Sequence, residues 1–206
     1  MNSDTLTANS VTALTSSCRS STVLLATAVV VVSSQSGATT HARTLIDPGA
    51  EVSFVSESLV QRLKLRRSSV AVPIIGVDNC KMMTKSSTTL TVSSRIDPTC
   101  SYTIEAHILQ KFTSYTPKCV KSVQLWSHFK DLVLADPDFA SNTPMELIIG
   151  VDLFSLIVQE EIARGPVGTP LGRRTTLGWI LVKLLILAYA LLKSPQLVTI
   201  TRLTSS

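Results

Sequence analysis

Residues 44–56 read TLIDPGAEVSFVS, and this stretch decides how the rest of the chain is interpreted. The short apolar run Leu45-Ile46 leads to one carboxylate, Asp47, and then to a turn made of Pro48 and Gly49. Proline fixes one backbone angle and glycine tolerates angles that other residues avoid, so both are typical turn residues. The pattern predicts a strand that ends in a tight loop bearing a single carboxylate.

The composition favours one mostly β domain with extensions. The chain has 206 residues, of which 45% are apolar and only 5% aromatic, and Ser, Thr, Val and Leu dominate. This usage is typical of β structure, and the length suits one ordinary domain. The net charge of +5 is spread along the chain. Solvated loop charges therefore explain it better than a nucleic-acid surface, and we expect no nucleic-acid partner.

The cysteine pattern argues against a metal centre. The sequence contains four cysteines, and no two of them have Cys-x-x-Cys spacing, so a zinc site is not supported and no cofactor is predicted. The chain is also too long and too apolar to resemble a disulfide-stapled secreted scaffold. We therefore expect reduced thiols and a cytoplasmic location.

Two apolar runs decide whether a membrane segment is expected. Val23–Val32 follows the polar residues 1–21, which we expect to be a disordered tail, and its valine content favours a buried strand. Residues 177–192 are interrupted by Lys183 and fall short of the roughly 20 apolar residues that a spanning helix needs. Membrane association through 177–192 is the less favoured alternative.

The first half of the chain predicts two hairpins separated by a helix. Val23–Val32 and Arg43–Ile46 are predicted to pair as strands across a Ser/Gly/Thr turn. Ser56 can cap a helix over 57–64, in which Leu59, Val60 and Leu63 share one face. A second hairpin is expected over Val70–Val92, and its turn residues are Gly76, Val77, Asp78 and Asn79.

The second half predicts shorter elements. Tyr102–Leu109 alternates as a half-buried strand, and Thr116–Asp138 is irregular, with Trp126, His128 and Phe129 packed on the core. A buried strand at Leu147–Ile149, a short helix at Asp152–Val158 and a final strand at Thr176–Val182 complete the fold class, which is mostly β with one or two short helices.

Several segments resemble one family in the same order. Residues 47–55 are similar to the active-site segment of the aspartic peptidase domain of Pao/BEL-type retrotransposon polyproteins, which is retropepsin-like. The other similar blocks are Leu63–Leu65 (LKL), Leu134–Phe139 (LADPDF), Leu147–Leu153 (LIIGVDL) and a closing segment from Gly165 to Leu181. The resemblance covers 22–183, so the apolar extension 184–206 lies outside the domain, and we expect residues 184–193 to form a helix.

The resemblance implies an acid-protease barrel and a mechanism. Asp47 would be the catalytic acid, Pro48, Gly49 and Ala50 would form its loop, and a homodimer would supply the second carboxylate for cutting an extended polypeptide. Gly76, Val77, Asp78 and Asn79 would be the tip of a flap. Ile148, Ile149 and Gly150 would support the Asp47 loop. The family usually has Ser or Thr where this chain has Pro48, which predicts impaired activity.

Alternatives remain for each acidic or basic candidate. Asp-Pro-Gly is also ordinary turn chemistry, and the chain would then be a catalytically inactive remnant that serves as a dimerisation or peptide-binding module. Asp152 is expected to cap the helix that follows it, and Asp97 and Asp136 are expected to form turns before prolines. His128 is expected at the edge of the core.

Overall fold

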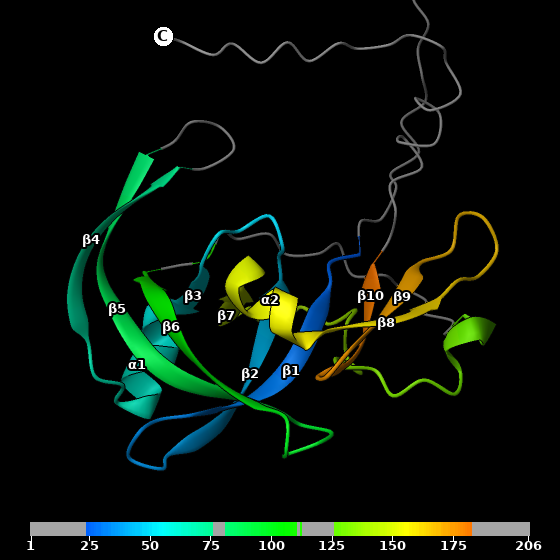
Figure 1. Cartoon of the computed structure of the whole chain (residues 1–206), viewed down its shortest axis with the longest axis horizontal. Coiled ribbons are helices and arrows are strands. Elements are labelled where there is room, and N and C mark those ends of the chain that lie inside the picture. Colours follow the sequence, from blue (N-terminus) through cyan, green and yellow to red (C-terminus); the bar gives the residue numbers. More distant parts are fainter. Residues whose placement is uncertain (1–23, 76–80, 111, 113–125, 183–206) are drawn as a thin grey trace, which may run out of the picture.

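The computed structural model describes residues 24–75, 81–110, 112 and 126–182. Ten strands and two short α-helices run through this part (Figure 1). The larger sheet has the order β1-β2-β7-β3-β6-β5-β4, and a further pairing of β1 with β5 closes six of its strands into a barrel. The smaller sheet has the order β10-β9-β8. The predicted mostly β barrel with short helices is therefore confirmed at this level.

The first hairpin carries the chain towards Asp47. β1 (Thr27–Ser33) pairs antiparallel with β2 (Thr39–Ile46), as predicted. Gly37 turns the chain between them with a positive φ of 86°, and its N–H donates to the Ser34 carbonyl. Alternate residues of β1 are buried in the barrel, which is the pattern of a strand with one face in the core.

β7 (Leu147–Ile149) lies between β2 and β3 (Ser53–Ser56). It pairs parallel with β2, which places Ile46 beside Ile149, and antiparallel with β3, which places Val55 beside Leu147. Leu147 and Ile149 are fully buried. The two strands on either side of the Asp47 loop are thus joined through a segment about 100 residues later in the chain.

The predicted first helix is confirmed. α1 spans Glu57–Leu63 and is capped by Ser56, whose hydroxyl accepts the Leu59 N–H at 3.2 Å. It ends at Lys64, which has a left-handed backbone conformation. The helical face that contains Leu59, Val60 and Leu63 is buried in the main core.

The second hairpin is also confirmed, with longer strands than predicted. β4 (Ser68–Ile75) pairs antiparallel with β5 (Lys81–Ser94), with an irregularity between Ser69 and Val72. β5 also pairs with β6 (Ser101–Leu109) as far as Ser87 and His107. From Ser86 back to Lys81, β5 pairs with β4 alone. The predicted tip residues 76–79, the polar tail 1–21 and the C-terminal extension 184–206 lie outside the described residues.

The smaller sheet contains two strands that the sequence did not predict. After α2 (Val151–Ile157), the chain forms β8 (Val158–Ala163), β9 (Leu171–Thr175) and β10 (Gly178–Val182). β8 reads VQEEIA and is mostly exposed, so no apolar alternation marked it. A short 3₁₀ helix at Ser127–Phe129 buries Phe129 in a second core cluster beside Leu181, as expected for that aromatic.

His128 lies at the edge of this second core. Its ring packs against that of Phe129 in a tilted arrangement with centroids 3.8 Å apart, and its Nε2 contacts the Pro170 carbonyl at 3.1 Å. This placement agrees with the expectation for His128.

Asp97 and Asp136 differ in burial and in their hydrogen-bond partners. Asp97 forms the predicted turn, where the hydroxyl and N–H of Thr99 both donate to its carboxylate and hold its pKa below the ordinary value. Asp136 is 2% exposed and accepts hydrogen bonds from Thr27 at 2.7 Å and from Arg43 at 2.8 Å. The prediction of a simple turn was therefore incomplete for Asp136, which is one half of a buried ion pair.

Arg43 connects this pair to the segment that precedes β7. Its remaining guanidinium N–H groups donate to the carbonyls of Phe139, Ser141 and Thr143 at 2.8 to 2.9 Å. Each of the three guanidinium nitrogens thus has an acceptor, which is the condition for burying a charge without a large cost.

No helix within 24–75, 81–110 or 126–182 has the length and apolar character needed to cross a membrane.

We predict that Asp136→Asn lowers the free energy of unfolding by about 3 kcal/mol, because it leaves the Arg43 charge buried without its partner. Glu146→Gln is the matched control, since it breaks the solvent-exposed pair with Arg62 and should cost no more than about 1 kcal/mol. Urea denaturation followed by circular dichroism measures both. Equal losses of unfolding free energy in the two variants would show that the buried ion pair contributes no more to stability than the exposed one.

Candidate functional site

Asp47 follows directly after β2 at the start of a tight turn. Its carbonyl accepts the Ala50 N–H at 3.0 Å, which closes a four-residue turn over Pro48 and Gly49. The Gly49 N–H donates to the Asp47 carboxylate Oδ1 at 3.0 Å. Asp47 is partly exposed and Pro48 is exposed. The loop therefore fixes a carboxylate by a backbone donor while solvent can still reach the group.

Proline suits the second position of this turn. It presets the backbone angle that a tight turn requires there, and it favours an extended residue before it, which Asp47 provides at the end of a strand. The turn is closed by the N–H groups of Gly49 and Ala50, so the N–H that proline lacks is not needed for it. The shape of the loop is thus compatible with Pro48.

The predicted supporting residues lie next to this loop. The Asp47 N–H donates to the Ile149 carbonyl at 2.9 Å, and the Val151 N–H donates to the Ala50 carbonyl at 2.8 Å. Gly150 sits so close to the loop that an added Cβ would lie 2.5 Å from the Val52 carbonyl oxygen and 2.8 Å from that of Ala50. Only glycine allows this approach without a backbone shift.

Asp152 binds an N–H of the first turn of α2, although Gly150 and not Asp152 occupies the N-cap position, and its carboxylate also reaches β3. The first turn of α2 is preceded by Gly150, which provides no side-chain cap. The Asp152 carboxylate instead accepts the Ser53 hydroxyl at 2.9 Å and the Ser53 N–H at 3.2 Å, as well as the Leu153 N–H at 2.8 Å. The Gly150 N–H in turn donates to the Ser53 hydroxyl at 3.2 Å. These bonds hold the end of the Asp47 loop against α2.

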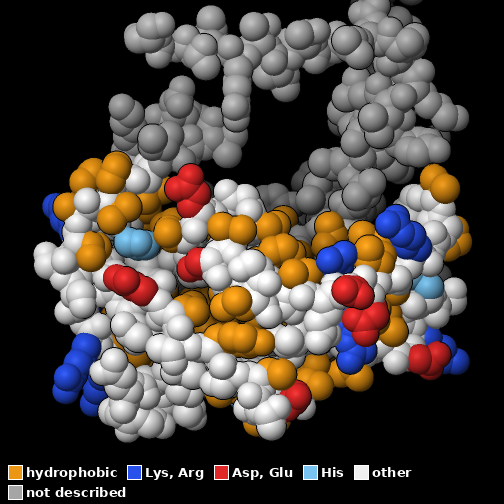
Figure 2. Space-filling view, in the orientation of Figure 1, with side chains coloured by type: hydrophobic (Ala, Val, Ile, Leu, Met, Phe, Trp, Pro, Cys, Tyr) orange, Lys and Arg blue, Asp and Glu red, His pale blue; other side chains and the backbone are white. Residues whose placement is uncertain are grey.

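Two exposed apolar side chains belong to α2, the helix that begins next to the loop. Val151 and Leu156 of α2 are 45% and 64% exposed. Figure 2 shows hydrophobic side chains gathered at the centre of the face where Figure 1 places α2. The Val151 N–H donates to the Ala50 carbonyl, so Val151 lies next to the Asp47 loop. Leu156 lies five residues further along α2 and roughly 140° around the helix axis.

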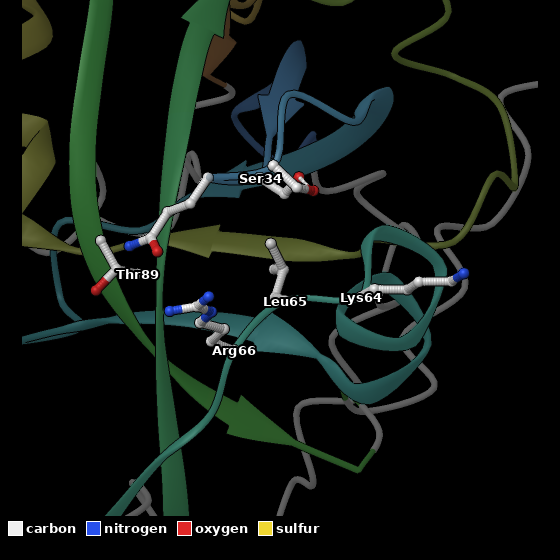
Figure 3. A pocket seen from close by; sticks show the side chains of 7 residues that line it. Ser34, Lys64, Leu65, Arg66 and Thr89 are labelled. Atoms are coloured by element: carbon white, nitrogen blue, oxygen red, sulfur yellow. Dashed lines mark hydrogen bonds between the residues drawn. The ribbon is translucent and has the colours of Figure 1, made fainter.

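Besides a depression of about 310 Å³ that is lined by the Asp97 turn and by Thr175 and Trp179, two depressions lie away from Asp47. The one in Figure 3, of about 230 Å³, is formed by the β1–β2 turn and the segment after α1, and Lys64 points away from Arg66 and Thr89 in that view. Because its two cations do not converge, it does not form an anion site. The other, of about 560 Å³, lies where β5 and β6 separate. At its edge Arg67 hydrogen-bonds the Glu57 carboxylate and, with help from Gln61, lowers the pKa of Glu57.

Within the described residues, no three His, Cys, Asp or Glu side chains come close enough together to hold a metal ion. No protein-family model matches the chain, and no curated protein matches it. The Asp47 loop and the residues around it are therefore the features that indicate a function.

We predict that Gly150→Ala destabilises the protein by about 1–3 kcal/mol, because the new methyl group overlaps the backbone of the Asp47 loop. Gly37→Asn is the control, since Gly37 has open space around it and asparagine tolerates a positive φ. The midpoint of urea denaturation measures both effects. If Gly150→Ala is as stable as the natural chain, the close packing behind the loop is not a constraint.

Proposed function

We propose that the chain is a retropepsin-like aspartic endopeptidase, derived from a Pao/BEL-type retrotransposon polyprotein, that hydrolyses peptide bonds of an extended polypeptide. The observation that carries the proposal is the Asp47 loop. A partly exposed carboxylate follows a strand, accepts the Gly49 N–H, and is supported from behind by β7. The blocks that resemble the Pao/BEL family add to this evidence.

The reaction needs two carboxylates around one water molecule. One is ionised and takes a proton from the attacking water, while the other is protonated and donates a hydrogen bond to the carbonyl of the bond to be cut. Two carboxylates a few ångström apart share one proton, because like charges at that distance resist joint ionisation. Asp47 can act in either role, since its Oδ1 is oriented by a backbone donor.

The second carboxylate would come from a second copy of the chain. The sequence contains one Asp-x-Gly segment of this kind, so the partner group is Asp47 of the other protomer in a two-fold symmetric dimer. The exposed Val151 beside the loop and the exposed Leu156 further along α2 support a contact through this helix, because burying such side chains between copies is favourable. The β4–β5 hairpin would cover the bound peptide as a flap.

Pro48 affects the chemistry more than the fold. A Ser or Thr hydroxyl at this position would form hydrogen bonds with the partner's loop across the dimer axis, and the N–H of the same residue would donate one to the hydroxyl of the partner's loop. Proline has neither group. The internal hydrogen bonds of the loop preserve its turn. The proposed pair of carboxylates, however, lacks the hydrogen bonds that would join the loops of the two protomers. We therefore propose that activity is impaired.

An inactive remnant is the second candidate, and Pro48 is the observation that favours it. In that case the chain would retain the barrel and the peptide-binding surface and would serve as a dimerisation or peptide-binding module. Binding without hydrolysis would distinguish it from the enzyme.

We predict that Pro48→Ser raises cleavage of a junction peptide at mildly acid pH about tenfold or more, because one restored hydrogen bond to a buried group is worth about 1–3 kcal/mol. Asp47→Asn in the same background should abolish cleavage, and pepstatin should inhibit it. Product formation measured by chromatography is the test. A natural chain that cleaves as fast as Pro48→Ser would show that residue 48 does not limit the reaction. A Pro48→Ser variant without activity would favour the inactive remnant.

We also predict a monomer–dimer equilibrium with a dissociation constant in the micromolar range or tighter, measured by sedimentation equilibrium. Leu156→Glu should weaken the dimer, because it places a charge in the proposed contact. Val167→Glu is the matched control, since Val167 is 96% exposed in the loop between β8 and β9. A chain that stays monomeric at high micromolar concentration would count against the dimeric enzyme.

A further inference from the structure

The chain contains one sequence motif twice. Residues 66–70 read RRSSV and residues 173–177 read RRTTL, so each has two arginines, one intervening residue, a hydroxyl residue and an aliphatic residue. Basophilic protein kinases recognise this pattern, because carboxylates in their substrate cleft bind arginines two and three positions before the hydroxyl that is phosphorylated. The sequence therefore offers Ser69 and Thr176 alike, and the surroundings of each residue decide between them.

The segment around Ser69 is open to a partner. Arg66, Arg67, Ser68 and Ser69 are all exposed, and residues 65–67 between α1 and β4 belong to no helix or strand. β4 is the last strand of the larger sheet, so its outer edge has no neighbouring strand among the described residues. A kinase binds its substrate as an extended chain, and an exposed segment that enters an edge strand is close to that shape.

The pairing of β4 with β5 is interrupted just after Ser69. Ser69 pairs with Ser86, and the next regular pair is Val72 with Thr84, so two residues of β4 lie opposite one residue of β5. Such a bulge leaves an extra residue unpaired and weakens the strand pairing locally. The first residues of β4 can therefore separate from β5 without opening the rest of the hairpin, which gives a kinase access to Ser69 and to Val70 after it.

Arg67 is available to a kinase although it forms an ion pair. Its guanidinium group binds the Glu57 carboxylate, with Nη1 3.0 Å from Oε2, and its side chain is 44% exposed. Ion pairs with this degree of exposure contribute little free energy. Arg67 can therefore exchange the Glu57 carboxylate for a carboxylate of the kinase.

Thr176 is in the opposite situation. It lies in the two-residue turn between β9 and β10, which is bent rather than extended. Its hydroxyl accepts the Tyr102 hydroxyl at 2.9 Å, and its N–H donates to the Ile157 carbonyl at 2.9 Å. Thr175 and Leu177 on either side are 2% and 0% exposed. A kinase would reach the Thr176 hydroxyl only by pulling apart the β9–β10 hairpin and part of the core.

We propose that Ser69 is a phosphorylation site for a basophilic serine/threonine kinase, and that the fold withholds Thr176 from the same kinase. The Ser69 hydroxyl oxygen attacks the γ-phosphorus of ATP, and the bond from that phosphorus to the bridging oxygen breaks. The serine proton passes to a carboxylate of the kinase, and the products are phosphorylated Ser69 and ADP. The inference is independent of the proposed peptidase activity, since it uses neither Asp47 nor a dimer.

The test incubates the full chain with ATP, magnesium and the catalytic subunit of the cyclic-AMP-dependent protein kinase, and maps the phosphate by mass spectrometry. Because such kinases prefer serine to threonine, the comparison uses the Thr176→Ser variant, which has the same nucleophile in both motifs. We expect residue 69 to be phosphorylated about tenfold faster than residue 176, or more, in the folded chain. Synthetic peptides covering 63–72 and 170–179, with the same substitution, should be phosphorylated at similar rates.

Single substitutions check the assignment within the first motif. Ser69→Ala should remove the phosphate from this segment, and Ser68→Ala should leave it, because Ser68 has its arginines one and two positions before it. Glu57→Gln releases Arg67 and should raise kcat/KM for Ser69 by up to about fivefold. Circular dichroism verifies that each variant is folded under the assay conditions.

Three results would overturn the proposal. The first is phosphate on residue 176 of the folded Thr176→Ser chain at a rate similar to that on Ser69. The second is phosphate on Ser68 in place of Ser69. The third is a folded chain that is phosphorylated at neither motif while both peptides are good substrates.

Discussion

The insertion of β7 between β2 and β3 is the constraint on which the rest of the structure depends. Parallel pairing on one side and antiparallel pairing on the other satisfy the backbone of three strands at once. The arrangement also brings Gly150 against the Asp47 loop, with room for no side chain at that position. A loop that would otherwise be a free turn on the barrel surface is thereby held in one place.

The Arg43–Asp136 pair stabilises the path that leads the chain to β7. Arg43 lies in β2, and its guanidinium group binds the carbonyls of residues 139, 141 and 143, just before the new strand begins. The Arg43 carbonyl also accepts the Glu146 N–H at 2.9 Å. The buried side chain of Arg43 thus connects the strand that leads to Asp47 with the segment that leads to β7. Loss of Asp136 should therefore weaken this connection as well as leave the Arg43 charge unpaired.

Fold and chemistry place different demands on residue 48. The turn needs a residue with a suitable backbone angle, and proline meets that demand. The proposed dyad needs a hydroxyl and an N–H at the same position, and proline has neither. A barrel with a correctly shaped loop can therefore persist while hydrolysis is weak or absent. Because the fold can persist without hydrolysis, peptide-binding experiments are as informative as kinetic ones for this chain.

Local interactions made several features predictable from the sequence alone. The Asp-Pro-Gly turn, the Ser56 cap and the Gly37 hairpin each depend on residues within four positions of one another. The family resemblance placed β7 beside the Asp47 loop, but its pairing partners, the burial of Asp136 and the partner of Asp152 depend on contacts about 100 residues apart, and only the tertiary structure decided them. β8 was missed because its exposed residues show no apolar alternation.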